Sequence, residues 1–183
     1  IFSKYYGVGW TKVYVEKLCK FYSNFGITKH TVMRISNAYG AYDKYDLEKS
    51  HFFGATITEV MNSKSGDDLL VWGDGLTERD LLHVSDVVDF IHKAIERQQS
   101  NYELYNVGYG KSYSVNDIVK MIISESGKEL KICHDLNKPS IKTKLALISD
   151  KARNELGWSP KTSIKDGINK TIKWYKNNLM ENK

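Results

Sequence analysis

The sequence predicts an α/β protein that contains at least part of a parallel sheet. Short apolar segments of strand type alternate with helical segments along the chain, and this alternation is typical of strand–helix–strand units. The composition is that of a globular domain, because 41% of the 183 residues are hydrophobic and 27% are charged. No apolar run reaches the ~18 residues of a membrane span, so we expect no membrane partner.

The helices and strands follow from the spacing of apolar residues, which is about 3.6 in helices and 2 in half-buried strands. The "NAYG" segment at 37–40 is expected to be a loop at the carboxyl end of a strand, where open α/β sheets bind ligands. The expected helices lie at 13–25, 51–63, 85–95, 115–123, 150–156 and from 163, and the expected strands at 30–36, 68–72, 79–84, 104–108 and 129–133.

Several residues mark the ends of these elements. Gly26 and Gly157 follow helical segments, where glycine commonly terminates a helix. Ser85 is expected to cap the helix that follows it. Ser114 with Asp117 resembles a capping box, and the last helix starts at about Ser163.

Charge and cysteine content exclude several classes of protein. The net charge of +5 is spread over scattered lysines, so we expect no nucleic-acid partner. Cys19 and Cys133 lie far apart in apolar segments without metal-like spacing. We therefore expect buried free thiols, no metal site and a cytoplasmic location.

The beginning of the chain predicts a missing upstream part. Ile1 is not a natural initiator, and no G-x-G-x-x-G loop occurs anywhere in the sequence. A doubly wound fold that binds a dinucleotide normally carries that loop after its first strand. We therefore expect that the chain is a fragment whose N-terminal half is absent.

Five segments of the chain form a recognisable series. In order they are "VMRISNAYG", "SHFFGATI", "VWGDGLTERDLLHVSDVVDFI", "YNVGYGKSYSVNDIV" and "NKPSIKTKLALISDKARNELGW". They resemble the extended short-chain dehydrogenase/reductases of the NAD-dependent epimerase/dehydratase family, and among these the GDP-fucose synthase-like enzymes. The third segment is the most specific, because it is similar to the family's Trp-Gly-x-Gly, Arg and Leu-x-His-Val-x-Asp pattern. The resemblance covers nearly the whole chain and corresponds to the family's C-terminal half.

The resemblance implies a catalytic Tyr and Lys four residues apart on one helix, with the Lys also binding the nicotinamide ribose. In "YYGVGWTK" the residue four before Lys12 is Val8, whereas Tyr6 is six before it and Tyr5 seven. We expect Tyr6 to act as the acid/base, brought toward Lys12 by a non-helical stretch at 7–10. Tyr5, or no tyrosine at all, remains the alternative, and Lys12 has the alternative of a solvated helix lysine.

The other site residues also follow from the resemblance. The backbone around Ser36, Asn37 and Ala38 is implied to contact the nicotinamide, and Asn37 is implied to contact the phosphate side of the sugar nucleotide. His51 is implied to be a second acid/base or a substrate ligand, with a helix cap as its alternative. The implied substrate-binding residues, each with an ordinary structural alternative, are Asn37, His51, Trp72, Arg79 and Lys138.

The family implies that the fold is the C-terminal part of a Rossmann-like doubly wound sheet with a small α/β substrate domain. Residues 1–40 would belong to the Rossmann domain and 41–183 mostly to the substrate domain, with 80–108 returning to the Rossmann sheet. The implied protein is a homodimeric NAD- or NADP-dependent epimerase, dehydratase or reductase that acts on a nucleotide-diphosphate sugar through a 4-keto sugar. A non-catalytic sugar-nucleotide or nucleic-acid binding relative, or a structural role, is the alternative.

Overall fold

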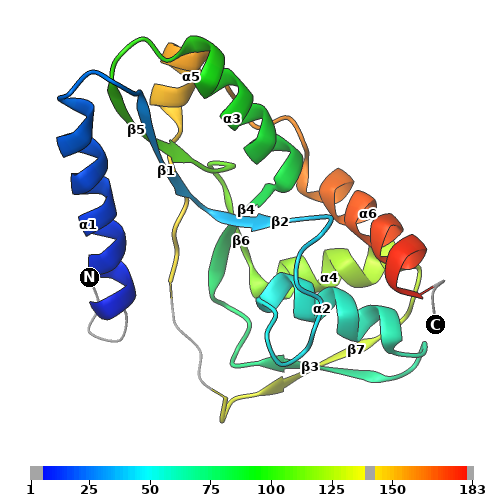
Figure 1. Cartoon of the computed structure of the whole chain (residues 1–183). Helices are drawn as coiled ribbons and strands as arrows, with labels where there is room; N and C mark the ends of the chain where they lie inside the picture. The colour runs from blue at the N-terminus through cyan, green and yellow to red at the C-terminus, as the bar shows by residue number, and fades with distance from the viewer. Residues whose placement is uncertain (1–5, 139–142, 181–183) are drawn as a thin grey trace.

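The computed structural model describes residues 6–138 and 143–180, in which strands and helices alternate as predicted (Figure 1). No helix in these ranges is long and apolar enough to cross a membrane. The helices are α1 (Tyr6–Ser23), α2 (Phe52–Asn62), α3 (Val84–Arg97), α4 (Val115–Ser126), α5 (Asp150–Leu156) and α6 (Ile164–Tyr175), followed by a π-helical turn, η2 (Lys176–Met180). The strands are β1 (His30–Ile35), β2 (Asn37–Tyr39), β3 (Asp68–Trp72), β4 (Glu78–His83), β5 (Tyr102–Val107), β6 (Ser112–Ser114) and β7 (Lys131–Asp135).

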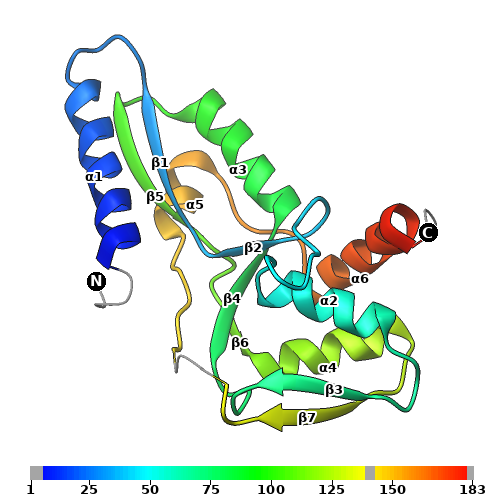
Figure 2. The same ribbon diagram turned by 60° about the horizontal axis from the view of Figure 1, so that its bottom comes forward.

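Strands β1 and β5 form a parallel pair that helices cover on both faces. The pairing runs in register from His30 opposite Tyr102 to Ile35 opposite Val107. Helix α1 lies on one side of the pair, and α3 and α5 lie on the other (Figures 1 and 2). Parallel strands joined through helices on both faces are the defining feature of a doubly wound α/β sheet.

The rest of the chain builds a second layered unit beside this pair. Strand β4 pairs with β2 in parallel and with β6 in antiparallel orientation, while β3 and β7 form a separate parallel pair. Helices α2 and α4 lie side by side over β3 and β7, and α6 follows next to α4 (Figure 2).

The buried apolar residues divide into two clusters that match these two units. The cluster beneath α2, α4 and α6 includes Ile57, Val60, Ile118, Ile122 and Ile168. The second cluster, between α3, α5 and β5, includes Phe90, Tyr105, Val107, Leu156 and Trp158.

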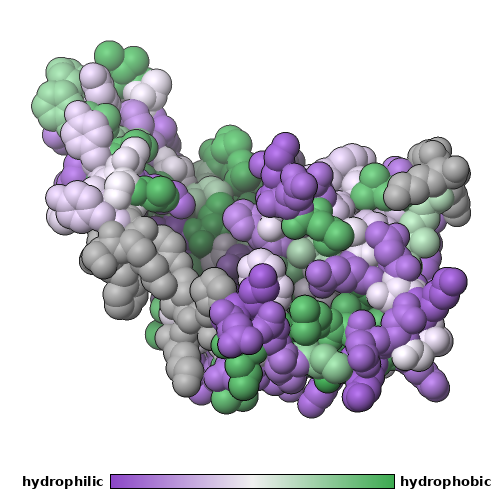
Figure 3. Space-filling view, turned by 90° about the horizontal axis from the view of Figure 1, so that it is seen from below, coloured by the Kyte–Doolittle hydropathy of each residue, from purple (hydrophilic) through white to green (hydrophobic). Residues whose placement is uncertain are grey.

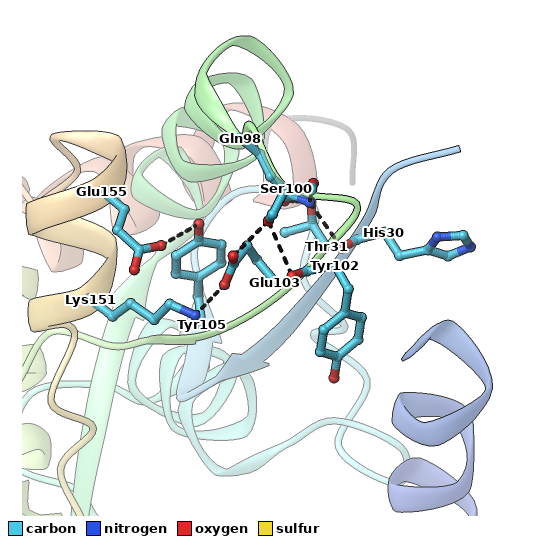
Figure 4. Close-up of polar contacts among 9 residues, drawn as sticks. All are labelled: His30, Thr31, Gln98, Ser100, Tyr102, Glu103, Tyr105, Lys151 and Glu155. Atoms are coloured by element: carbon cyan, nitrogen blue, oxygen red, sulfur yellow. Dashed lines mark hydrogen bonds and ion pairs between the residues drawn. The ribbon is translucent and has the colours of Figure 1, made fainter. Parts of the chain in front are cut away.

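Polar contacts fasten the amino-terminal ends of β1 and β5, opposite the end where ligands are expected (Figure 4). The buried Gln98 accepts a hydrogen bond from Thr31 Oγ1 at 2.5 Å and donates to the carbonyl oxygens of His30 and Ser100. Tyr105 donates to Glu155, and Lys151 forms an ion pair with Glu103. These contacts tie α3 and α5 to the strands and have a structural role.

The structure corrects two predictions about the first third of the chain. Helix α1 begins at Tyr6, although glycines lower helix propensity by about 1 kcal/mol each relative to alanine. The turns of α1 before residue 13, which the sequence did not predict, are stabilised by contacts between residues one turn apart. Thr11 Oγ1 donates to Gly7 O at 2.8 Å, and the Tyr6 ring contacts Trp10. The "NAYG" segment is not only a loop, because Asn37–Tyr39 is a strand that pairs with β4.

The cap of α3 is His83 and not Ser85. The backbone N–H of Ser85 donates to His83 Nδ1 at 3.3 Å, and the Ser85 hydroxyl group contacts the same nitrogen at 2.7 Å. The predicted cap at Ser114 is confirmed, since its hydroxyl accepts from the backbone N–H three residues later, and Ser163, where the last helix was expected to start, caps α6 in the same way. A histidine in a strand-like segment gave no local signal for capping, because serine is the more common N-cap residue.

Candidate functional site

A cavity of about 340 Å³ lies between α2 and β3 and reaches β4. Four residues of α2 line it at i, i+3, i+4 and i+7 spacing, which places them on one helix face. They are Phe52, Ala55, Thr56 and Glu59. Leu69–Trp72 of β3 forms the opposite wall, and Thr77, just before β4, and Arg79 of β4 also line the cavity.

Close contacts at its first turn fix the position of α2. The ring of Phe53 lies 4.3 Å from that of Tyr39, so the start of α2 is held at the end of β2. Gly54 allows the preceding loop to pass, because a Cβ atom there would lie 2.4 Å from the carbonyl oxygen of Lys44. The first turn of α2 is therefore at the sheet edge where the predicted sugar-binding residues lie.

Three of the predicted substrate-binding residues come together. Trp72 and Arg79, which belong to different strands, line the same cavity. Arg79 Nη1 donates to Thr143 Oγ1 at 3.2 Å, which orients the guanidinium group. Trp72 is 59% exposed, and Lys138 Nζ lies 5.1 Å from the centre of its indole ring system. A fixed guanidinium beside an open aromatic face suits a phosphate group followed by a ring.

His51 is at the entrance of α2 rather than among the cavity-lining residues. It is exposed and takes the N-cap position, but its side chain makes no capping hydrogen bond. Its neighbours Ser50 and Phe52 line the cavity. His51 therefore occupies the cap position without a capping hydrogen bond from its side chain, and its role as an acid/base or a substrate ligand stays a prediction.

Ser36, Asn37 and Ala38 lie at the carboxyl end of β1, where the chain passes into β2. Asn37 Nδ2 donates to the carbonyl oxygen of Asp80 at 3.0 Å, which joins β2 to β4. The hydroxyl oxygen of Ser36 is buried and has no hydrogen-bond partner among residues 6–138 and 143–180. A buried hydroxyl group without a partner is uncommon in folded proteins.

The predicted non-helical stretch between Tyr6 and Lys12 is wrong, because α1 is a regular helix through 7–10. At about 100° per residue, six residues turn Tyr6 and Lys12 about 120° apart around the axis. Tyr6 is 67% exposed and packs edge-on against Trp10, with ring centroids 6.3 Å apart. The assignment of the acid/base to Tyr6 rested on that stretch and loses its geometric basis. Tyr5 lies outside the described residues.

Sequence reasoning missed two acidic residues, Asp80 next to Arg79 in the chain and Glu59 in the cavity. Asp80 is buried, and its carboxylate accepts backbone hydrogen bonds from Tyr109, Gly110 and Leu147 at 2.9–3.1 Å. Glu59 lines the cavity, and its pKa is raised because burial removes water from its carboxylate. The helical spacing from Phe52 contained the signal for Glu59, whereas the three donors to Asp80 are too distant in sequence to be predicted.

The model of a family described as "NAD dependent epimerase/dehydratase family" matches residues 4–108. The chain belongs to the NAD-dependent epimerase/dehydratase family. The predicted resemblance is thereby confirmed. No cluster of three or more His, Cys, Asp or Glu residues in the described part of this family member could hold a metal ion.

Two curated relatives carry names that involve nucleotide sugars. The chain is 32% identical to the putative GDP-L-fucose synthase 2 of Arabidopsis thaliana over 150 residues, which are 81% of this chain and 45% of that protein. It is 32% identical to the GDP-L-colitose synthase of Yersinia pseudotuberculosis over 143 residues, which are 77% of this chain and 46% of that protein. The chain of this family member spans about half the length of the curated relatives that it matches.

Two solved enzyme structures share the fold. The UDP-glucose 4-epimerase of Thermotoga maritima with UDP-glucose superposes with a TM-score of 0.77 and 25% identity, covering 90% of this chain and 51% of that one. The dTDP-glucose 4,6-dehydratase of Bacillus anthracis in complex with NAD gives a TM-score of 0.66 and 29% identity, covering 82% and 45%. The predicted fold class, part of a Rossmann-like α/β sheet, is confirmed for this member of the epimerase/dehydratase family.

Proposed function

We propose that the full-length protein is an NAD(P)-dependent enzyme that converts a nucleotide-diphosphate sugar through a 4-keto sugar. The observation that carries this proposal is the cavity that unites Trp72 of β3 with Arg79 of β4 beside one face of α2. Membership of the epimerase/dehydratase family and the names of the curated relatives support it. Epimerase, dehydratase and reductase reactions share this binding requirement.

The substrate roles follow from the chemistry of the cavity. The guanidinium group of Arg79 would bind the diphosphate, because it offers two parallel N–H donors to phosphate oxygens. Trp72 would pack against a ring of the ligand, with Lys138 above the indole adding positive charge. Asn37 and His51, at the end of β2 and the start of α2, would face the sugar.

Residues at the end of β1 and on α1 would hold the nicotinamide part of NAD or NADP. The buried hydroxyl group of Ser36 would bond the carboxamide, next to the backbone of Asn37 and Ala38, and Lys12 would bind the ribose. When bound, the dinucleotide would supply reversible hydride transfer. Lys12 would also favour the deprotonated form of an acid/base on its own side of α1 by its positive charge.

We propose a two-domain organisation with the predicted boundaries. Residues 1–40 would belong to the dinucleotide-binding domain and 41–183 mostly to the substrate domain, with 80–108 returning to the first. The parallel pairing of β5 with β1 supports this division, as do the two separate clusters of buried apolar residues.

A second candidate is a nucleotide-sugar binding relative without turnover. The regular helix favours it, because Val8 occupies the position four before Lys12 and Tyr6 lies on another side of α1. Incubation of the full-length protein with nucleoside diphosphate sugars and NAD or NADP, followed by product analysis, tests the two candidates. Product formation supports the enzyme, binding by calorimetry without product supports the relative, and the absence of any binding contradicts both.

We also propose that the protein is a homodimer that uses the outer face of α1. The exposed aromatic residues Tyr6, Trp10, Tyr14, Phe21 and Phe25 share one side of the helix and its C-terminal turn. Green and pale atoms cover much of this projecting end in Figure 3. Exposed aromatic surface of this extent is typical of interfaces. Sedimentation analysis of the full-length protein and its Trp10→Glu variant tests this, and a wild-type monomer would contradict it.

A cytoplasmic location is proposed from the chemistry of the two cysteines. Cys19 and Cys133 are both free and only partly buried. Unpaired thiols of this kind are retained in a reducing compartment. Fractionation of the source cells, with an antibody against the protein, tests the location.

A further inference from the structure

A bidentate ion pair joins helix α1 to strand β1. Arg34 Nε donates to Glu16 Oε1 at 2.9 Å, and Arg34 Nη2 donates to Glu16 Oε2 at 2.7 Å. In the part of the chain that the structure describes, no other side-chain hydrogen bond or ion pair connects α1 with a strand. A guanidinium group that engages both oxygens of a carboxylate fixes direction as well as distance. This pair therefore defines how α1 is rotated about its axis relative to β1.

Apolar packing contributes little to that rotation. Within Tyr6–Ser23, which the structure describes in full, Ser23 is the only buried residue. Val13 and Cys19, which lie about one turn before and one turn after Glu16, are only partly buried. So little buried apolar surface gives one rotation of the helix only a small advantage over its neighbours. The polar contact of Glu16 with Arg34 is therefore the specific restraint on α1.

The same restraint determines where Lys12 lies along β1. Helix α1 and strand β1 run in opposite directions (Figures 1 and 2). The step back from Glu16 to Lys12 is one helical turn, about 6 Å along the axis. The step forward from Arg34 to Ser36 covers about 6.6 Å of strand in the same direction. Because the two steps match, a helix held at Glu16 and Arg34 places Lys12 beside Ser36.

The side chain of Ser36 points to the face of β1 that α1 covers. Side chains two residues apart in a strand share a face, so Ser36 follows Arg34, whereas Met33 packs on the opposite side against the cluster between α3 and α5. The backbone N–H of Ser36 donates to Val107 O at 3.0 Å, so the pairing with β5 extends to this residue. Its hydroxyl oxygen is buried without a partner among the described residues. This hydroxyl group and the ammonium group of Lys12 thus lie together at the carboxyl end of β1.

We propose that Glu16 is a positioning residue, which through its ion pair with Arg34 holds α1 in the rotation that presents Lys12 to the ribose of NAD or NADP beside Ser36. The inference rests on the proposed function, which assigns the cofactor to Lys12 and Ser36. Arg34 has a second effect, because it engages both carboxylate oxygens of Glu16. Residues four apart on a helix readily form ion pairs, and Arg34 keeps Glu16 from pairing with Lys12 in this way. The ammonium group of Lys12 is therefore left to the cofactor.

Calorimetry of NAD and NADP binding to the full-length protein tests the inference. Glu16→Gln should weaken binding of the preferred dinucleotide about 3- to 5-fold, the range expected for a partly exposed ion pair. Arg34→Met should weaken it further, because the released carboxylate of Glu16 pairs with Lys12. The double variant Glu16→Gln/Arg34→Met should then bind better than Arg34→Met alone. Damage to the fold would add up in the double variant and could not produce this recovery.

Two further measurements separate positioning from stability. In a Lys12→Met background Glu16→Gln should cause no further loss of affinity, because the group that it positions is gone. Glu103→Gln is the matched control, since it breaks the ion pair between β5 and Lys151 of α5, at the opposite end of the strands from Ser36. This control should lower the melting temperature about as much as Glu16→Gln does, without changing the affinity for either dinucleotide.

The possible failures are distinct. If Glu16→Gln leaves the affinity unchanged, or weakens it equally with and without Lys12, Glu16 does not position the lysine and the inference is overturned. A double variant that binds no better than Arg34→Met overturns it as well. In each of these cases the proposed function stands if the wild type forms product from a nucleotide sugar. If the wild type binds neither dinucleotide and forms no product, both fall together.

Discussion

Tyr6 and Lys12 lie on one regular helix but face directions about 120° apart around its axis. Tyr6 is on the side of Trp10, with which it makes an edge-to-face contact. Val8, four residues before Lys12, lies on the lysine's side of the helix. A working acid/base pair requires the phenol and the ammonium group to reach the same substrate atoms, and the helix does not provide that for Tyr6.

The first prediction concerns this pair. Tyr6→Phe in the full-length protein should lower kcat by far less than the ~10²–10⁴-fold that loss of a general acid/base causes. Lys12→Met should reduce both cofactor affinity and kcat. Steady-state kinetics with Tyr5→Phe measured in parallel provide the check. A loss of 10²-fold or more in Tyr6→Phe would show that the first turn of α1 changes its conformation when substrate binds.

The second prediction uses two helical glycines with different surroundings. Gly7→Ala should stabilise the protein by about 0.5–1 kcal/mol, because a Cβ atom there meets nothing within 4 Å and alanine favours the helix. Gly167→Ala should destabilise it by about 1–3 kcal/mol, since its Cβ atom would lie 2.0 Å from the Tyr39 hydroxyl group. Denaturant unfolding measures both. A destabilising Gly7→Ala would argue against a helical backbone at that position.

The third prediction concerns Arg79. Arg79→Ala should raise KM for the nucleotide sugar about 10- to 100-fold with kcat nearly unchanged, because a diphosphate contact acts equally on the ground and transition states. This corresponds to the ~1.5–3 kcal/mol of a charge-assisted hydrogen bond. Arg153→Ala, which removes an exposed arginine of α5, should change neither constant. A collapse of kcat at constant KM would place Arg79 at the reacting carbon instead.

The fourth prediction concerns pH. Burial lowers the pKa of His83, with the nearby Lys170 acting in the same direction and Asp86 against it. An unfolded histidine titrates near 6.5, so below that pH the unfolded chain binds a proton that the folded protein does not. The free energy of unfolding should therefore fall as the pH is lowered from about 6.5 through the folded pKa, by at most ~1.4 kcal/mol per pH unit.

The structure explains why the free energy of unfolding should fall at low pH, and it offers a control histidine for the measurement. Protonation of His83 Nδ1 removes the acceptor for the backbone N–H of Ser85, and with it the cap of α3. Urea unfolding between pH 7.5 and 5 should show a shallower pH dependence in His83→Asn, which keeps a capping oxygen but does not titrate there. His92→Gln, at an exposed position on α3, should retain the wild-type slope. Equal slopes in all three proteins would refute the assignment.

Local patterns in the sequence were sufficient for most of the elements and for the family. Apolar spacing placed α2, α3, α4 and α6, and Ser114 was identified as a cap because a cap contacts a residue only three positions away. The motif that resembles the family predicted Trp72 and Arg79 as substrate-binding residues, and both line the cavity. Such information is local, so the sequence expresses it directly.

Only the tertiary structure decided how these residues meet. Glu59, Trp72 and Arg79 line one cavity because α2, β3 and β4 pack together, and no spacing in the sequence encodes that arrangement. Asp80 is buried because donors near residue 109 and at Leu147 converge on it. The sequence also left the backbone at the start of α1 undetermined, because Gly7 and Gly9 permit either a helical or an irregular conformation. The helix propensity of a glycine differs from that of alanine by only about 1 kcal/mol, so side-chain contacts one turn apart can decide between the two. The contacts of Trp10 with Tyr6 and of Thr11 with Gly7 favour the helix, and the helix directs Tyr6 away from Lys12.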